Sequence, residues 1–400
     1  MNKTSLAKLA LSSIKALAIG SLVASAGAAY GQSFSSVLDG FKEGSKASLN
    51  VRARYEYNET PASEVNGYSL RTRLAFETGE YEGLKLFVEM EDLSFNNDDD
   101  RPGLDVPTTE LNQAWFSYEG AKVGRQIFVL DDHRYIGHVG WRQNIQTYDA
   151  ASYSYDIDEK SKLTFAYLDA VHRVNATSQD LSGIVLNGSS KLTENFTLTG
   201  YAYLLDFDRP VLSSSDTYGI RGAGKIPGDE VTYNYSFSYA KQVDNSGSVR
   251  DFDVDYLAGE FGAAFGGLSL TAGVEILDGD GVMGFTTPLA TVHKFNGFAD
   301  VFAANSLGLA GGLPEGLEDY YLTFGFKAGD VPVKLTYHSF DTAGSGEYLG
   351  SEIDLVASYK LNEYVTLIGK FADYSTNGGA TVSYGTADKQ VLTVEANLAF

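Results

Sequence analysis

Hydrophobic and polar residues alternate one by one over most of the chain. The stretch Leu49–Tyr57 is representative, because apolar side chains hold its odd positions and the even positions hold Asn50, Arg52, Arg54 and Glu56. Successive side chains of a β-strand point to opposite faces, whereas helical spacing would scatter these residues around an axis. The pattern therefore predicts amphipathic strands, each with one apolar and one polar face.

About eighteen such strands follow one another, each of about ten residues, which suits a tilted strand that crosses a bilayer. They are predicted to start near residues 48, 68, 84, 111, 122, 148, 161, 183, 196, 216, 231, 252, 267, 319, 331, 351, 364 and 389. Long connections such as Asn58–Gly67, Asp169–Leu181 and Leu277–Leu317 alternate with short ones such as Glu119–Ala121. Outer-membrane barrels place long loops outside and tight turns in the periplasm.

These features predict an all-β fold over residues 47–400. Because an unpaired sheet edge cannot face lipid, the strands are expected to close into a single antiparallel transmembrane β-barrel. The expected size is about 18 strands, within a range of about 16–18. An even number of strands places both termini in the periplasm of a Gram-negative-type cell, with outer-membrane lipid and lipopolysaccharide around the barrel.

The chain ends on a strand whose last residue is Phe. In Val391–Phe400 the apolar residues share one face. This ending resembles the C-terminal strand signature that the barrel-assembly machinery of bacterial outer membranes reads. That machinery is therefore an expected partner through Phe400.

The first 31 residues are typical of a signal peptide. Lys3, Lys8 and Lys15 supply the positive region, Ala16–Ala24 is a short apolar core, and small residues precede Gln32. The alternative, a membrane anchor, is disfavoured because the apolar core is too short to span a bilayer. Residues 32–46 are then expected to form a periplasmic N-terminal segment.

Charge and cysteine content narrow the function further. The net charge of −22 argues against nucleic acid as a partner, and the absence of Cys excludes disulfides and thiolate metal sites. Acidic runs fall on predicted outer loops, at Asn96–Asp100, Asp131–Asp132 and Asp278–Asp280. They are candidates to bind calcium or to meet lipopolysaccharide through divalent ions, and the alternative is that they are simply solvated.

Motifs for enzymatic chemistry are weak. Gly279–Gly284 matches a dinucleotide-binding glycine pattern, but no helix is predicted after it, and no G-x-S-x-G elbow or H-E-x-x-H pair occurs. No enzyme activity and no cofactor are therefore expected. A Ser–His pair near the barrel rim would mark the alternative, an outer-membrane hydrolase, because such pairs are formed in space and not in sequence.

The arginines form the most informative set of charges, since most of them lie between residues 50 and 145. The candidate pore-lining residues are Arg52, Arg54, Arg71, Arg73, Arg125 and Arg142, opposed by Glu56, Glu77, Glu89, Glu91 and Asp149. Opposed rows of charge inside a barrel create a transverse field, and guanidinium groups bind carboxylates in bidentate fashion. The set predicts a constriction that selects anionic or polyhydroxylated solutes, or else an ion-pair ladder that only fills the barrel.

Two segments resemble the alginate-export family of outer-membrane porins. They are Gly124–Gln126 with Trp141–Gln143 and Tyr148–Ala150, and Thr287–Thr291 with His293–Gly297. The resemblance implies an eighteen-stranded channel whose lumen carries Arg and Lys that bind a uronate polymer. This chain departs from it in the second half, where Asp253, Asp255, Glu352 and Asp354 are expected to make the wall acidic.

Together the patterns predict a porin for passive diffusion of small polar or anionic solutes, such as sugar acids or oligosaccharides. Apolar pieces of the loop Leu277–Leu317 are suited to fold inward as a plug or gate. Besides the hydrolase, a structural or adhesion barrel with a plugged lumen is the remaining alternative.

Overall fold

The computed structural model describes residues 39–400 except 97–100, 210–213, 246–247, 249 and 304–311. The predicted signal peptide and most of the acidic run Asn96–Asp100 lie outside the described residues. Within the described part, no helix is long and apolar enough to cross a membrane. The strands are β1 (Lys46–Thr60), β2 (Ser63–Glu77), β3 (Leu84–Phe95), β4 (Thr108–Tyr118), β5 (Ala121–Gln126), β6 (Thr147–Asp156), β7 (Ser161–His172), β8 (Ser178–Thr193), β9 (Phe196–Phe207), β10 (Ser215–Ile226), β11 (Val231–Val243), β12 (Asp253–Phe265), β13 (Leu268–Leu277), β14 (Leu317–Ala328), β15 (Val331–Asp341), β16 (Tyr348–Lys360), β17 (Val365–Thr376) and β18 (Lys389–Ala399).

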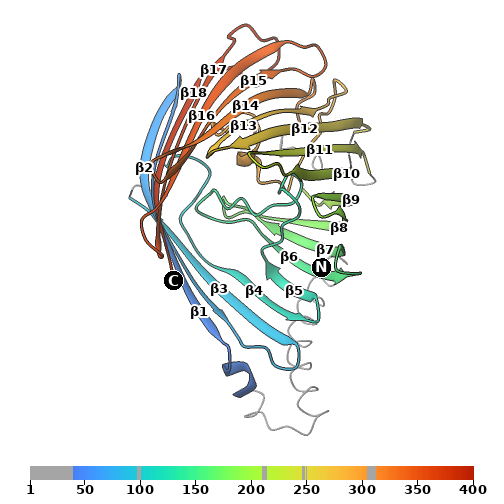
Figure 1. Ribbon diagram of the computed structural model, residues 1–400, viewed down its shortest axis with the longest axis vertical. Helices are drawn as coiled ribbons and strands as arrows, with labels where there is room; N and C mark the ends of the chain where they lie inside the picture. The colour runs from blue at the N-terminus through green and yellow to red at the C-terminus, as the bar shows by residue number, and fades with distance from the viewer. Residues whose placement is uncertain (1–38, 97–100, 210–213, 246–247, 249, 304–311) are drawn as a thin grey trace, which may run out of the picture.

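The eighteen strands form one closed antiparallel barrel, as the alternation predicted (Figure 1). Each strand pairs with its neighbours in sequence, and β1 closes the ring by pairing with β18 from Asn50↔Ala399 to Glu59↔Gln390. Closure gives every strand two partners, so that no row of backbone N–H and C=O groups is left open to lipid. The predicted fold class is confirmed.

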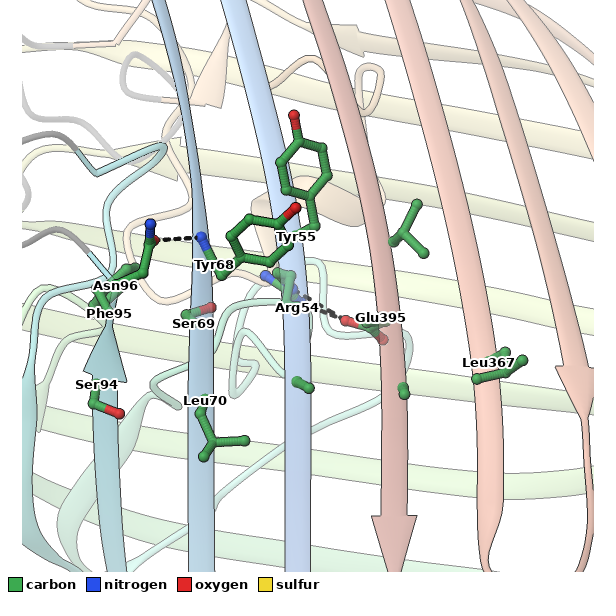
Figure 2. A pocket seen from close by; sticks show the side chains of 13 residues that line it. Arg54, Tyr55, Tyr68, Ser69, Leu70, Ser94, Phe95, Asn96, Leu367 and Glu395 are labelled. Carbon is green, nitrogen blue, oxygen red and sulfur yellow. Dashed lines mark hydrogen bonds and ion pairs between the residues drawn. The ribbon is translucent and has the colours of Figure 1, made fainter.

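The two faces of the wall carry opposite chemistry. On β2, Leu74 is 58% exposed whereas Arg71 is 2% exposed, the reverse of a water-soluble sheet. Figure 2 shows Tyr55, Tyr68, Leu70 and Leu367 on the outer face, around a shallow groove of about 600 Å³. An apolar exterior over a polar interior is stable where lipid is the outer solvent and water or protein fills the lumen.

Three details differ from the expectations. The connection Asn58–Gly67 is not a long loop, because β1 and β2 stay paired up to Thr60↔Ser63, and Asp169–Leu181 is shortened in the same way by the pairing of β7 with β8. Asp253 and Asp255 belong to the outer face, because Tyr256, the residue next to Asp255, points inward and is buried. Only Glu352 and Asp354 of that predicted acidic set face the interior, where both are 1% exposed.

Two irregular segments enter the barrel and pack against each other. One comprises residues 127–146 between β5 and β6, and the other comprises residues 278–303 and 312–316 between β13 and β14, with the short helix η2 (Val292–Lys294). In Figure 1 the teal segment after β5 runs across the interior of the ring. A parallel bridge between Ile136 and Leu289 joins the two segments, and both residues are buried. We call the two segments together the luminal insert.

Candidate functional site

Four arginines on two adjacent strands hold one stretch of the luminal insert. The donors, which we call the arginine ladder, are Arg52 and Arg54 of β1 and Arg71 and Arg73 of β2. Arg52 Nη1 donates to the carbonyls of residues 140, 141 and 142 at 3.2, 3.4 and 3.0 Å, and Arg54 donates to the carbonyl of Trp141. Arg71 and Arg73 donate to the carbonyl of Gln143 at 3.4 and 3.3 Å. The ladder therefore binds protein backbone at the place where a solute was expected.

Carboxylates of the wall complete the ladder. Glu395 of β18 accepts from Arg54 Nη2 at 2.8 Å, on the inner side of the wall in Figure 2. Glu91 of β3 pairs with Arg73, and its side chain is fully buried. Because a buried charge needs a partner, each carboxylate fixes the orientation of the guanidinium that reaches the insert. Glu395 was missed in the sequence, since it lies at the far end of the chain from its partner.

Trp141 lies at the centre of the contact between the ladder and the second segment. Its ring stacks on His293 with centroids 4.2 Å apart and an interplanar angle of 3°, and His293 stacks in turn on Phe298 at 5.0 Å. Arg54 lies 4.4 Å and Lys370 Nζ 3.4 Å from the Trp141 centroid. Three stacked rings and two cation–π contacts thus join both segments of the insert to the wall.

A chain of ion pairs and hydrogen bonds connects the same two segments. Arg142 donates to Glu56 of β1 at 3.2 Å and to Asp300 at 3.1 Å, and Asp300 also contacts His293 Nδ1 at 3.0 Å. Burial lowers the pKa of His293 to about 4, so the ring is neutral at pH 7. Burial opposes the ionisation of Asp300, but His293 and Arg142 outweigh it and bring the pKa of Asp300 to about 2.

Further hydrogen bonds fasten the insert to the rest of the wall. Arg134 is buried and donates to Glu275 of β13 at 2.7 Å, and Tyr148 Oη of β6 donates to the carbonyl of residue 137 at 2.7 Å. Arg173 Nη1 donates to the carbonyl of Pro288 at 2.6 Å. Buried and hydrogen-bonded around its edge, the insert narrows the lumen as a packed element and not as a loose loop.

The remaining predicted residues do not join the ladder. Arg125 and Asp149 pair with each other at 3.0 Å. Because their strand neighbours Gln126 and Tyr148 are buried on the inner side of the wall, this pair lies on the opposite, outer face. Glu89 faces inward and accepts from Asn112 and Gln113 at 2.7 and 3.0 Å, and Glu77 is a half-buried residue at the end of β2.

Asp149 is part of a small polar cluster on that outer face. His172 Nε2 lies 3.2 Å from Asp149 Oδ2, and His172 Nδ1 contacts the hydroxyl of Ser178. The order Ser–His–Asp is the one that hydrolases use. Here Arg125 also binds the carboxylate, with 3.0 and 3.4 Å contacts to its two oxygens.

The acidic pair Asp131–Asp132, predicted on an outer loop, lies in the luminal insert and has partners within the protein. Asp131 accepts from Asn187 at 2.7 Å, and Asp132 pairs with Arg221 at 3.1 Å. Within the part of the chain that the structure describes, no group of three or more His, Cys, Asp or Glu is placed to hold a metal ion. The structure thus gives no support to the calcium hypothesis.

The insert leaves a cavity of about 420 Å³ beside the wall formed by β10 to β16. Insert residues from Lys294 to Phe298 form one side of it. Across from them lie charged and hydroxyl-bearing side chains of the wall, among them Arg221, Ser236, Glu260, Tyr321, Thr323, Lys334 and Thr336. This cavity, unlike the arginine ladder, offers free space inside the barrel beside the insert.

A comparison with known protein families identifies the family of the chain. The alginate export family matches residues 45–271, which include β1 to β12 and the first segment of the insert. The chain belongs to the alginate export family. The resemblance read from Trp141–Gln143 and Thr287–Thr291 is thereby confirmed at the level of the family, although the second of these segments lies outside the matched residues. No curated protein sequence matches the chain.

Solved structures with the same fold include proteins of two bacteria. OccK5 (OpdH) of Pseudomonas aeruginosa is 16% identical, with a TM-score of 0.68 over 90% of this chain and 99% of its own. OpdK of P. aeruginosa, crystallised with vanillate, is 14% identical, with a TM-score of 0.71 over 90% and 100%. OccAB2 of Acinetobacter baumannii is 14% identical, with a TM-score of 0.71 over 90% and 99%. At these identities the likeness shows the barrel fold alone.

Proposed function

We propose that this family member is a passive outer-membrane channel for small polar solutes, in which the luminal insert sets the width and the arginine ladder holds the insert in place. The observation that supports this most is the set of contacts from four arginines to the carbonyls of residues 140–143. Guanidinium groups that lined an open pore would face water and solute; these groups face backbone. The solute then passes beside the insert, along the acidic and hydroxylated wall.

A periplasmic location of both termini, contact with lipopolysaccharide, and recognition by the barrel-assembly machinery through Phe400 belong to the same proposal. They are supported by the even number of strands, the apolar outer face and the pairing of β18 with β1. Alginate is not the solute that we propose, because a polyanion would meet the exposed carboxylate of Glu260 on the cavity wall.

The test of channel activity is single-channel recording of the purified, folded protein in a planar bilayer. Discrete current steps with a linear current–voltage relation are expected, because the cavity beside the insert is lined by polar and charged groups. A folded protein that conducts no ions would exclude the channel and favour a plugged structural or adhesion barrel.

A second measurement separates anchoring from charge selection by the ladder. If Arg71 and Arg73 also select solutes, replacing both with Ala lowers the anion-to-cation permeability ratio, read as a shifted reversal potential under a salt gradient. If they only anchor, the conductance rises as the insert loosens, and the reversal potential stays where it was. Anchoring is the expected result, since both groups donate to the carbonyl of Gln143.

Acid is expected to loosen the insert. His293 has a pKa of about 4 when packed on Trp141, because of burial, against 6.5 in water. His293 therefore binds a proton more readily when the insert is released than when it is packed. The packed state keeps its full stability above about pH 6.5, where His293 is neutral in both states. It loses about 1.4 kcal/mol per pH unit as the pH falls from about 6.5 to 4.

The measurement is the frequency of larger current steps between pH 7 and 4. Burial also lowers the pKa of His138 to about 4, so this residue contributes in the same range. A variant with His138→Gln and His293→Gln should lose most of the acid response. The same response in wild type and variant would show that other groups control it.

The cluster of Ser178, His172 and Asp149 supports a hydrolase as the second candidate function. The channel is favoured, because Arg125 neutralises the carboxylate that would have to stabilise a charged imidazole. A fluorophosphonate probe decides between them. Labelling that disappears in Ser178→Ala and needs His172 would establish a reactive serine; an unlabelled wild-type protein would leave the cluster as a structural one.

A further inference from the structure

The luminal cavity has two charges of opposite sign that the protein itself leaves available. Glu260 of β12 is exposed and accepts a hydrogen bond from Tyr321 at 3.0 Å, and Lys334 of β15 is exposed to the same cavity. Across the described residues, neither has an oppositely charged group within 4.0 Å. A solute in the cavity can therefore pair with both.

Most of the other charges of the cavity are already paired. His338 lies 2.8 Å from Asp319 and 3.6 Å from Asp354, and both carboxylates are buried. Arg221 pairs with Asp132 at 3.1 Å. Lys294 belongs to the insert and not to the wall, and its Nζ donates to the backbone carbonyl of Asp132 at 2.8 Å. Charges that are paired inside the protein attract a passing solute less than free ones do. Selection thus depends mainly on Glu260 and Lys334.

The spacing of the two charges sets the length of the solute. Glu260 of β12 lies in register with His338 of β15, three strands away, and Lys334 precedes His338 by four residues on β15. Three strand spacings of about 4.8 Å and a rise of about 13 Å along β15 place the two Cα atoms about 19 Å apart, and the Glu and Lys side chains shorten the gap between the charges by reaching toward each other. An extended peptide of two or three residues spans about 7–11 Å. A single amino acid, whose charges are adjacent, cannot reach both groups.

The wall between the two charges suits a peptide backbone. The hydroxyls of Thr323 and Thr336 lie 2.9 Å apart on neighbouring strands between these positions, and Ser236 lines the same cavity. Hydroxyl groups both donate and accept, so they can pair with peptide N–H and C=O groups. Phe295 and Phe298 of the insert offer aromatic faces to side chains on the opposite side.

We infer that the cavity selects short zwitterionic peptides, whose ammonium group meets Glu260 and whose carboxylate meets Lys334. The inference rests on the proposed channel function and names the solute class for the same lumen. It differs from an anion-selective pore in requiring both charges of the solute at once.

Three peptides that differ only in their end charges test the inference. Triglycine carries both charges, N-acetyl-triglycine only the negative one, and triglycine amide only the positive one. Entry into proteoliposomes, followed by swelling, is expected to be about 1.4- to fivefold faster for triglycine than for either capped peptide, the range for one exposed charge pair. Glu260→Gln should abolish the faster entry of triglycine relative to N-acetyl-triglycine. Lys334→Gln should abolish the faster entry of triglycine relative to triglycine amide.

Glu363→Gln and Lys360→Gln serve as matched controls, because they remove the same charges from the end of β16 and its following turn, outside the cavity. Both should keep the wild-type preference. Equal rates for the three peptides, or equal losses for all three in the cavity variants, would overturn the inference. Single-channel conductance is recorded in parallel. A wild-type protein that does not conduct refutes the channel function, whereas a conducting protein without peptide preference refutes only the solute class.

Discussion

Neutralising the arginine ladder together with its carboxylate partners is expected to raise the single-channel conductance at least about twofold, because the insert would no longer restrict an eighteen-stranded lumen. The variant combines Arg→Gln at residues 52, 54, 71 and 73 with Glu91→Gln and Glu395→Gln, so that no buried carboxylate is left unpaired. Each hydrogen bond from a charged group contributes about 1.5–3 kcal/mol. The ladder makes several of them to residues 140–143.

The matched control is the ion pair of the outer face. Arg125→Gln with Asp149→Asn removes a comparable pair without touching the insert, and its conductance should equal that of the wild type. If the ladder variant folds and conducts as the wild type does, the insert is held by other contacts. Those of Arg134 with Glu275 and of Tyr148 with the carbonyl of residue 137 would then be the next to examine.

Replacing Trp141 with Ala is expected to destabilise the packed insert by about 3–5 kcal/mol, the usual cost of truncating a large packed aromatic side chain. The variant loses the stack on His293 and the contacts with the cations of Arg54 and Lys370. Lys370 would also lose its cation–π contact with the Trp141 ring, which stabilises its charge beside His293. The result should be frequent transitions to larger conductance and faster amide exchange in residues 133–146.

Trp115 provides the control, since it is the only other tryptophan of the chain. It lies on β4, stacks on Phe87 of β3 at 5.0 Å and lies 4.4 Å from Lys122 of β5, so that these partners all belong to the wall. Trp115→Ala should cost similar packing within the wall but leave exchange in residues 133–146 unchanged. Equal exchange in that segment for Trp141→Ala and wild type would show that the stack does not hold the insert.

These expectations make the insert a constriction with a defined latch. The latch consists of backbone carbonyls bound by the ladder, one aromatic stack, and the contacts of Arg142 with Glu56 and Asp300. Each part joins the first segment of the insert either to the wall or to the second segment. Opening therefore requires all of them to break together, which favours discrete conductance steps over gradual widening.

The sequence by itself determined the barrel. Period two identified all eighteen strands, most within three residues of their observed starts, because the lipid and luminal sides of a membrane strand impose opposite chemistry on alternate residues. The same pattern placed Arg52, Arg54, Arg71 and Arg73 on the luminal face. It misplaced Arg125 and Asp149, since alternation is hardest to read on a strand as short as β5 and beside the bulge that follows Asp149.

Only the tertiary structure decided what the arginines bind. Arg54 meets the Trp141 carbonyl 87 residues away and Glu395 341 residues away. Alternation reports the direction in which a strand side chain points, whereas the path of an irregular segment is set by packing and hydrogen bonds that no local pattern records. For that reason the sequence predicted a charged lumen, and only the structure shows that these arginines donate to the backbone of the insert and that Glu260 and Lys334 line the cavity beside it.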